Sequence, residues 1–323
     1  MNLVPATPAS LQLAAEIIRN GNLVAFPTET VYGLGADALN ATACAKIFAA
    51  KNRPYFDPLI VHLADLSWLE KLSAQFDERA RRLAEKFWPG PLTLVVPKTD
   101  RVPDIVTAGL PSVALRMPNH PLALELLRAA QTPIAAPSAN PFGYLSPTTA
   151  QHVAEQLGNK IDLILDGGPC PIGVESTILD LTEEKPRLLR PGGLPLETLE
   201  PLAGRIEIYQ SDSERPLAPG QLPSHYAPRT PVAFLSADFK FPADQKAGLL
   251  AFQTPIENLP FAKIEILSPA GDLAEAAANL FSCLHRLDRA GLQIIFVEPV
   301  PEIGIGSAIM DRLRKAAGIR QVE

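Results

Sequence analysis

Short apolar runs alternate with amphipathic spacings along the first part of the chain. Predominantly apolar runs predict buried strands at 23–26, 59–63, 92–96, 113–116, 134–136, 163–166 and 177–181. Between many of them, apolar residues recur with the helical period in 11–18, 41–51, 77–87, 119–130 and 148–157. Asn40 and the segment Ser146-Pro147-Thr148 are start signals for two of these helices. The pattern predicts an α/β layer architecture with a mixed sheet.

The periodicity stops between Ile206 and Pro231, where the chain becomes polar and rich in proline. This composition is typical of an interdomain linker, and the prolines favour an extended path that can lie across a surface. Beyond it, the pattern predicts four strands and two helices, the strands at 232–235, 248–252, 264–267 and 294–297 and the helices at 273–290 and 307–317. We therefore expect a first domain over residues 1–205, a linker over 206–231 and a smaller α/β domain over 232–323.

Length and composition agree with a folded protein of two domains. The chain has 323 residues, of which 47% are hydrophobic and 20% charged, and a typical domain has ~150 residues. Its net charge of −6 excludes the overall basic field of a dedicated nucleic-acid or anionic-membrane binder, so any polyanion site must be a local cluster. No apolar run approaches the ~18 residues of a membrane span.

The three cysteines, Cys44, Cys170 and Cys283, are far apart and form no Cys-x-x-Cys pair. They therefore indicate neither a disulfide framework nor a zinc site, and a reducing compartment fits best. The first basic residue is Arg19, so no basic segment precedes an apolar leader. We expect a cytoplasmic protein that does not enter a membrane.

Residues 27–35, Pro-Thr-Glu-Thr-Val-Tyr-Gly-Leu-Gly, follow the first predicted strand. Hydroxyl groups and a Gly-x-Gly at a strand end suit the close approach of a ligand. A tight turn between strand and helix explains the same residues. The standard dinucleotide and P-loop fingerprints are absent, because no third glycine follows at the required spacing and no Gly-x-x-x-x-Gly-Lys occurs.

A pair of cations, Lys51 and Arg53, lies at the end of the helix predicted at 41–51, just before Pro54. Because proline turns the chain out of the helix, the two cations can point at one phosphate chain. The alternative is the favourable placement of cations at a helix C-terminus.

Ser138 and Asn140 lie between two prolines at the end of the strand predicted at 134–136. Ligands of open α/β sheets bind beyond the carboxyl ends of strands, and these side chains offer neutral donors and acceptors. A Ser/Asn turn is the competing interpretation. The segments 173–177 and 189–193 are weaker signals of the same kind, explained equally by turns at strand edges.

Arg116 ends the predicted strand at 113–116 and His62 lies inside the one at 59–63. An arginine is expensive to bury unless it meets a carboxylate or a phosphate, so Arg116 indicates either an anion site or a structural ion pair. His62 is a candidate catalytic base or a core histidine. No two histidines have the spacing of metal ligands.

Together and in this order, the motifs resemble the YrdC-like family of L-threonylcarbamoyladenylate synthases, in its long form with an extra C-terminal domain. The resemblance rests on PTETVYGLG at 27–35, KNRP at 51–54, PLIVH at 58–62, WPGPLT at 88–93, APSAN at 136–140, GVEST at 173–177, RPG at 190–192 and SHYAP at 224–228. It covers residues 1 to about 205 strongly and reaches the last domain through the ending GxGxAIxDRLxKAA at 304–317.

The resemblance implies a YrdC-like twisted mixed sheet with helices, followed by a smaller Rossmann-like α/β domain. It implies a nucleotidyltransferase that converts ATP, L-threonine and bicarbonate or CO2 into threonylcarbamoyl-AMP and pyrophosphate, with Mg2+ accompanying ATP. A downstream threonylcarbamoyl transferase complex is then expected to use the product for the t6A modification of tRNA.

The resemblance also implies the residues of the site. Those expected near threonine are Thr30, His62, Arg116 and Ser176, with Arg116 as the carboxylate clamp. Those expected near ATP are Lys51, Arg53, Ser138, Asn140, Ser146, Arg190 and Tyr226, with Lys51 and Arg53 as the catalytic cations. Asp57 stands where many relatives are expected to carry asparagine, so it is left out. No protein ligand is expected for Mg2+, which phosphate and water oxygens largely hold.

This chemistry agrees with the residues. A carbamate of threonine that attacks the α-phosphate needs no serine or cysteine nucleophile, so positioning and charge neutralisation suffice. Two other functions compete. A module that binds double-stranded RNA or tRNA would use the same local basic surface without nucleotide turnover. A carbamoyl-transfer domain of the hydrogenase-maturation type shares the core fold but normally accompanies zinc-finger cysteines.

The segment Ser224-His225-Tyr226-Ala227-Pro228 places an aromatic residue and a histidine inside the polar linker. In the family these residues fold back over the catalytic pocket. The hypothesis is therefore that the linker is a lid whose Tyr226 covers the nucleotide and excludes water. The alternative is that Tyr226 only pins the linker to the second domain.

Overall fold

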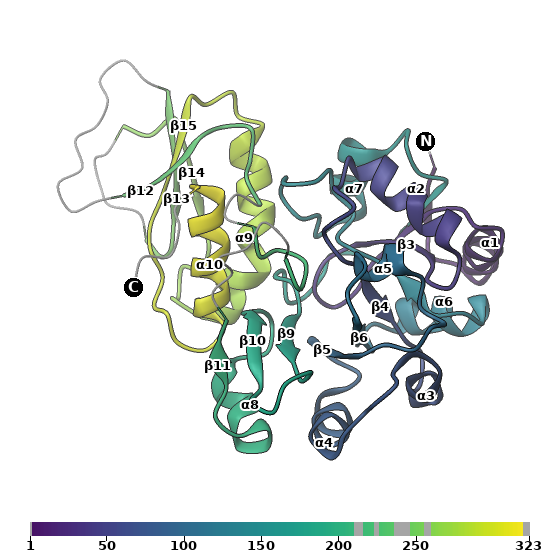
Figure 1. Ribbon diagram of the computed structural model, residues 1–323. Coiled ribbons are helices and arrows are strands. Elements are labelled where there is room, and N and C mark those ends of the chain that lie inside the picture. Colours follow the sequence, from purple (N-terminus) through teal and green to yellow (C-terminus); the bar gives the residue numbers. More distant parts are fainter. Residues whose placement is uncertain (1, 210–215, 223–225, 236–245, 255–259, 319–323) are drawn as a thin grey trace.

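The computed structural model describes residues 2–209, 216–222, 226–235, 246–254 and 260–318 (Figure 1). Eleven of the described strands form one mixed sheet in the order β1-β8-β2-β3-β7-β4-β6-β5-β9-β10-β11. These strands are β1 (Leu3–Pro5), β2 (Val24–Phe26), β3 (Gly33–Asp37), β4 (Ile60–His62), β5 (Leu92–Pro97), β6 (Ser112–Arg116), β7 (Ile134–Ala135), β8 (Leu163–Asp166), β9 (Thr177–Asp180), β10 (Arg187–Arg190) and β11 (Glu207–Ile208). The predicted mixed sheet is confirmed.

Helices cover both faces of this sheet because its strands are apolar on both sides. Val24 and Phe26 of β2 pack into one hydrophobic cluster with α1 (Pro8–Arg19) and α6 (Pro121–Ala130). Ala25, which points the other way by the alternation of a strand, joins the cluster of the opposite face. The helices that contribute to that second cluster are α2 (Ala41–Lys51), α3 (Leu69–Leu72), α4 (Glu78–Phe87), α5 (Asp104–Thr107), α7 (Ala150–Leu157) and α8 (Leu196–Ala203). A short 3₁₀ turn, η1 (Leu66–Trp68), precedes α3.

The last part of the chain forms a second, four-stranded sheet whose described strands are all parallel. Its order is β12-β15-β13-β14, with β12 (Val232–Phe234), β13 (Ala247–Ala251), β14 (Lys263–Ile266) and β15 (Ile294–Val297). Two helices, α9 (Leu273–Asp288) and α10 (Gly306–Ala316), pack on one face. In Figure 1 they lie between this sheet and the first domain.

The two parts of the chain share a continuous hydrophobic cluster. Val31 and Val174 of the first domain pack in it with Leu280 and Phe281 of α9. Gly173 shows how close the approach is, because a Cβ atom at this position would overlap the backbone of Ala277 and Ala278 in α9, and its φ is 78°. The glycine of the GVEST motif is therefore required by the neighbouring helix.

Local signals predicted most elements, and the differences have physical causes. Helix α2 begins after Asn40, whose side chain accepts a hydrogen bond from Ala43 N, and ends at Asn52 in the left-handed conformation with a φ of 53°. Helix α7 instead begins two residues later than predicted, because Thr149 is its N-cap. Four strands of the first sheet were not predicted. Strands β1 and β11 have only three and two residues, β3 is rich in glycine, and β10 ends in the segment that was interpreted as a turn.

Candidate functional site

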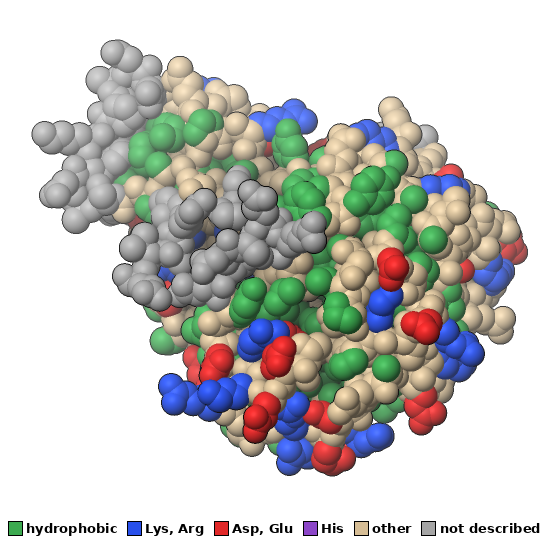
Figure 2. Space-filling view, viewed as in Figure 1, with side chains coloured by type: hydrophobic (Ala, Val, Ile, Leu, Met, Phe, Trp, Pro, Cys, Tyr) green, Lys and Arg blue, Asp and Glu red, His purple; other side chains and the backbone are tan. Residues whose placement is uncertain are grey.

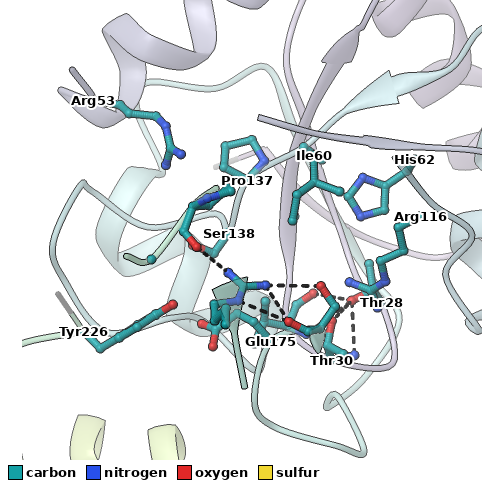
Figure 3. Close-up of a pocket in the computed structure, with 17 residues that line it drawn as sticks. Thr28, Thr30, Arg53, Ile60, His62, Arg116, Pro137, Ser138, Glu175 and Tyr226 are labelled. Atoms are coloured by element: carbon teal, nitrogen blue, oxygen red, sulfur yellow. Dashed lines mark hydrogen bonds between the residues drawn. The ribbon is translucent and has the colours of Figure 1, made fainter. Parts of the chain in front are cut away.

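A pocket lies where the first domain and the linker meet (Figure 3). The structure brings eight of the predicted site residues to its wall: Thr30, Arg53, His62, Arg116, Ser138, Ser176, Arg190 and Tyr226. Figure 3 shows Arg53 and Tyr226 on one side, His62 and Arg116 on the other, and Ser138 and Glu175 between them. Lys51, Asn140 and Ser146 do not line it.

Arg116 and His62 form one end of the pocket because their strands are neighbours. Strands β4 and β6 run parallel, and their register places His62 directly beside Arg116. Arg116 is 4% exposed, and its Nη2 lies 2.7 Å from Glu29 Oε1. The angle of this ion pair does not satisfy a hydrogen bond, so Nη2 has no hydrogen-bond partner among the described residues. A buried guanidinium with an unused donor is suited to an incoming carboxylate.

Hydroxyl groups line the same pocket as Arg116. Thr28 and Thr30 face each other at 2.8 Å between their Oγ1 atoms, and Ser176 Oγ lies 2.7 Å from Thr93 Oγ1. Thr28 also donates to the carbonyl of Val31 at 2.7 Å, so it folds the 27–35 turn onto itself. These neutral groups can orient the polar atoms of a small ligand without adding charge.

His62 remains neutral at ordinary pH. Burial, followed by the neighbouring positive charge of Arg116, lowers its pKa to about 3. Its Nδ1 has no hydrogen-bond partner among the described residues, and its ring packs edge-on against Phe26 at 6.3 Å between centroids. The imidazole is therefore available as a neutral donor or acceptor, while proton transfer near neutral pH is disfavoured.

Lys51 and Arg53 point to different places because Asn52 between them is left-handed. The buried Lys51 ammonium donates to the carbonyl oxygens of Ser138 and Asn140, and burial and the charge of Arg53 hold its pKa well below the usual range. Lys51 thus braces the loop that presents Ser138. Arg53 lines the pocket itself.

Arg53 is held by short contacts to its own loop. Its Nε donates to Asp57 O at 3.0 Å, its Nη2 donates to Pro58 O at 2.7 Å, and it pairs with the Asp57 carboxylate at 2.9 Å. Asp57, which the sequence comparison left outside the site, is therefore the counter-ion that keeps Arg53 buried and oriented.

Arg190 reaches the pocket from the end of β10. Its Nε and Nη2 donate to Ser176 O at 3.1 and 2.8 Å, and its Nη1 donates to Pro219 O of the linker at 3.2 Å. Gly192 allows this arrangement, since a Cβ there would overlap the backbone of Ser176 and Thr177. Arg190 therefore connects the GVEST segment with the linker.

The linker closes the second end of the pocket. Tyr226 is 1% exposed, lies in the left-handed region with a φ of 60°, and packs its ring 5.9 Å from that of Phe281. Its hydroxyl lies against Gly220, where no side chain fits. The cavity that remains is about 40 Å3, whereas small-molecule sites usually enclose ~300–1,000 Å3. Ser224 and His225, the other residues of the predicted lid motif, lie outside the described residues.

Sequence reasoning did not identify three residues of this region. Glu175 lines the pocket and is 5% exposed, Thr28 lines it beside Thr30, and Arg312 of α10 contacts Glu175 from the second domain. The acidic residue inside GVEST was a local signal for Glu175. The ending GxGxAIxDRLxKAA at 304–317 includes Arg312 but did not indicate its contact with the site, because its partner Glu175 is 137 residues away.

Fold and pocket together define a class: a two-domain α/β protein with three buried arginines and several hydroxyls around one pocket, suited to a small anionic substrate. The family model Sua5_yciO_yrdC, described as telomere recombination, matches residues 16–192, and the model Sua5_C, described as threonylcarbamoyl-AMP synthase, C-terminal domain, matches residues 194–318. The chain belongs to the Sua5/YciO/YrdC family, in the form that carries the Sua5 C-terminal domain.

Similar proteins of known name span the whole chain. The threonylcarbamoyl-AMP synthase of Pyrococcus abyssi is 46% identical over 97% of this chain and 95% of its own, and that of Bacillus subtilis is 44% identical over 96% and 93%. The crystal structure of P. abyssi Sua5 complexed with L-threonine superposes with a TM-score of 0.90 at 45% identity, covering 98% of this chain and 97% of its own. A full-length HypF, 18% identical with a TM-score of 0.51, shares the fold alone.

Within the described ranges, no three His, Cys, Asp or Glu side chains gather in a way that would hold a metal ion. Among the same residues, none of the helices combines the length and the apolar character needed to cross a bilayer.

Proposed function

We propose that this protein is a threonylcarbamoyl-AMP synthase, which forms threonylcarbamoyl-AMP and pyrophosphate from ATP, L-threonine and bicarbonate or CO2. The named relatives support the reaction, and the buried, incompletely satisfied Arg116 is the observation that supports the substrate assignment within the pocket. Its guanidinium can hold the α-carboxylate of an amino acid by a bidentate grip. Thr30, Ser176 and neutral His62 surround it and can receive the amine and the hydroxyl group of threonine.

ATP is assigned to the other end, where Arg53, Ser138 and Arg190 line the wall. Two guanidinium groups can neutralise charge on the triphosphate while Ser138 contributes a neutral hydrogen bond. Lys51 and Asn140 act indirectly in this assignment: Asn140 donates to Pro141 O and Tyr144 O, and Lys51 holds the same loop. Ser146 also acts indirectly, because its hydroxyl donates to the carboxylate of Glu175, which lines the pocket.

The proposed reaction has two steps. The threonine amine attacks CO2, forming an N–C bond and releasing one proton to solvent, which gives a carbamate. A carbamate oxygen then attacks the α-phosphorus of ATP, and the bond to the bridging oxygen breaks to release pyrophosphate. The protein's part is to hold the two substrates in line and to stabilise negative charge, and its arginines suit that role.

Mg2+ is proposed to enter with ATP, where it would supply charge neutralisation on the phosphates. The only carboxylate among the pocket-lining residues is Glu175, and its oxygens already meet Ser146 and Arg312. The described residues therefore fit an ion bound mainly by phosphate and water oxygens, the usual manner of Mg2+ at nucleotides.

The lid hypothesis for Tyr226 is supported by its burial in the linker against the pocket, whose cavity of about 40 Å3 is small for a nucleotide. Tyr226 contacts both the pocket and Phe281 of α9. Covering the site and pinning the linker are therefore compatible roles. A lid would protect the mixed anhydride product from hydrolysis.

Transfer of the product to tRNA by a downstream threonylcarbamoyl transferase, and a cytoplasmic location, follow from the proposed activity. Direct binding of tRNA or double-stranded RNA is the rival function. On the face shown in Figure 2, Lys and Arg side chains intermingle with Asp and Glu instead of forming a separate basic surface. The described part of this face therefore lacks the extended basic surface that RNA-binding modules use.

The deciding experiment incubates the full chain with ATP, Mg2+, bicarbonate and each of the twenty amino acids in turn, and measures pyrophosphate. We expect release that depends on threonine and on bicarbonate, with threonylcarbamoyl-AMP identified by mass spectrometry. Salt-sensitive binding of tRNA without nucleotide turnover would instead support the RNA-binding alternative.

A further inference from the structure

Helix α10 of the second domain places a fully buried arginine, Arg312, behind two residues that line the pocket, Glu175 and Tyr226. The side chain of Arg312 is 0% exposed. Its Nε lies 2.7 Å from Glu175 Oε2, its Nη2 donates to Pro191 O at 3.1 Å, and its Nη1 contacts the neighbouring Asp311. Its guanidinium carbon lies 4.8 Å from the centre of the Tyr226 ring.

These contacts converge on three segments of the site. Glu175 and Tyr226 line the pocket, and Pro191 directly follows Arg190. One turn further along α10, Lys315 donates to the carbonyl of Gly220 at 2.7 Å and is paired with Asp311 at 2.8 Å. Helix α10 therefore contacts the linker at two places, Gly220 and Tyr226, both of which line the pocket.

We propose that Arg312 is a positioning residue of the active site: it fixes the Glu175 carboxylate and the Tyr226 ring, so that the second domain completes the pocket. The assignment gives the C-terminal domain a role in the chemistry of the first domain. It rests on the proposed function for its activity readouts, and the exchange measurement below tests it without them.

Docking of the two domains does not need Arg312. Their boundary is mainly the apolar cluster that contains Val31, Val174 and Phe281. It also includes a hydrogen bond between Thr148 and Ser282 at 2.9 Å and an exposed ion pair between Arg289 and Glu155 at 2.5 Å. Removing Arg312 should therefore loosen Glu175 and Tyr226, which keep their contacts with Ser146 and Arg190, while the domains stay together.

The pKa of Glu175 offers a second way to detect the effect of Arg312. Burial alone would raise the pKa of Glu175, but Arg312 and then Arg190 outweigh it, so the pKa lies below its ordinary value. The groups that face this carboxylate are Arg312 from α10, Arg190 from β10, Ser146 before α7 and Tyr226 from the linker, with Asp311 behind Arg312. Without Arg312, the effect of burial is less well opposed, so the pKa of Glu175 rises and the carboxylate takes up a proton at higher pH.

The test compares full-length Arg312→Gln and Arg312→Lys with the control Arg289→Gln, which removes an ion pair between the domains that does not touch the pocket. Threonine-dependent pyrophosphate release is measured from about pH 6 to 9, and hydrogen exchange is followed in 171–177 and 216–222. We expect Arg312→Gln to lower kcat/KM by roughly 10²-fold, to move the acidic limb of the pH profile upward and to increase exchange in both segments. Arg289→Gln should resemble the wild type.

Arg312→Lys separates charge from geometry. It retains the positive charge, so the pH profile should stay near that of the wild type, while the lost planar contact with Tyr226 still lowers kcat. If Arg312→Gln is poorly folded, a double variant that combines Arg312→Met with Glu175→Gln takes its place, because it removes both partners of the buried ion pair. We expect this double variant to fold and to remain poorly active.

Three results would overturn the proposal. The first is an Arg312→Gln enzyme with the wild-type kcat/KM, pH profile and exchange. The second is an equal loss in Arg312→Gln and Arg289→Gln, which would reduce Arg312 to a docking contact. The third is full activity of the double variant. A wild-type chain without threonine-dependent turnover would instead refute the proposed function, and the exchange comparison would still decide whether Arg312 holds the two segments.

Discussion

The two ends of the pocket are built in different ways. At the end assigned to threonine, His62 and Arg116 come from β4 and β6, which are hydrogen-bonded neighbours, and Ser176 precedes β9 of the same sheet. At the end assigned to ATP, Arg53 follows a helix, Arg190 ends an outer strand, and Tyr226 belongs to the linker backed by α10. One end depends on a single sheet, and the other on three separate parts of the chain.

This difference matches what each end must do. A sheet with helices on both faces holds side chains rigidly, which favours selection of a small amino acid. A linker held by a few polar contacts can move, which suits the proposed entry of a nucleotide and the release of a product. The comparison therefore predicts that variants at the sheet end change threonine binding alone, whereas variants at the linker end change nucleotide handling and product release.

The largest effect is expected for Arg53→Ala and Lys51→Ala, and activity should fall by about 10²–10³-fold in each. Arg53→Ala removes a cation from the proposed phosphate site, whereas Lys51→Ala removes the support of the loop that presents Ser138. The two variants should lose activity in different ways. Arg53→Ala should raise the KM for ATP in a folded protein, while Lys51→Ala should also loosen the loop at 138–140, whose carbonyls it holds. Steady-state kinetics and thermal unfolding distinguish them, and near-normal pyrophosphate release in both would remove these cations from the site.

Arg116→Lys should affect the other end. An ammonium cannot reproduce a bidentate grip on a carboxylate, so we expect the KM for threonine to rise by about 10–100-fold with little change in the KM for ATP. Initial-rate measurements with each substrate varied in turn are sufficient. An unchanged affinity for threonine would place Arg116 in a purely structural ion pair with Glu29.

Tyr226→Ala should give a smaller, qualitatively different effect. With the ring absent, water can reach the acyl-adenylate, so a fraction of the turnover should end as free AMP, with product formation lowered by roughly 10-fold. Separation of AMP from threonylcarbamoyl-AMP by chromatography measures the fraction. A truncation near Gly204 that stays folded and binds ATP should show the same defect more strongly, and intact product at the full-length rate would leave the linker as a tether.

The smallest effect concerns pH and stability. Burial first, and nearby charges second, lower the pKa of His62 and His152 to about 3, and burial lowers that of His285 to about 4. The unfolded chain binds these protons near pH 6.5 and the folded chain does not, so stability is fully present above pH 6.5 and is lost as the pH falls toward 4.

Each histidine can contribute a slope of up to roughly 1.4 kcal/mol per pH unit in that range. Urea unfolding followed by tryptophan fluorescence at several pH values measures the slope. His285→Asn should reduce it by removing one partner of the His152–His285 stack, whose ring centres are 4.0 Å apart at the domain boundary. His62→Asn should also reduce the slope, because it removes the buried histidine at the threonine end of the pocket. An unchanged slope in both variants would contradict this assignment.

Sequence alone determined the elements whose causes are local. Asn40 and Asn52 define helix α2, and the apolar runs at 92–96 and 294–297 became strands β5 and β15. Eight motifs also indicated the family and seven side chains of the pocket, and the eighth, Arg116, was indicated by its place at the end of a predicted strand. These predictions succeeded because capping, strand alternation and motif spacing depend on residues close together in the chain.

Tertiary structure alone decided which of the candidates meet, and what the second domain contributes. Lys51 and Arg53 are two residues apart but diverge at left-handed Asn52, whereas Arg312 reaches Glu175 across 137 residues. Gly173 is required by the backbone of α9, which no turn signal reveals. Close approach and charge pairing between distant segments follow from how the sheet and the two last helices pack, and the periodicity of a sequence does not encode that arrangement locally.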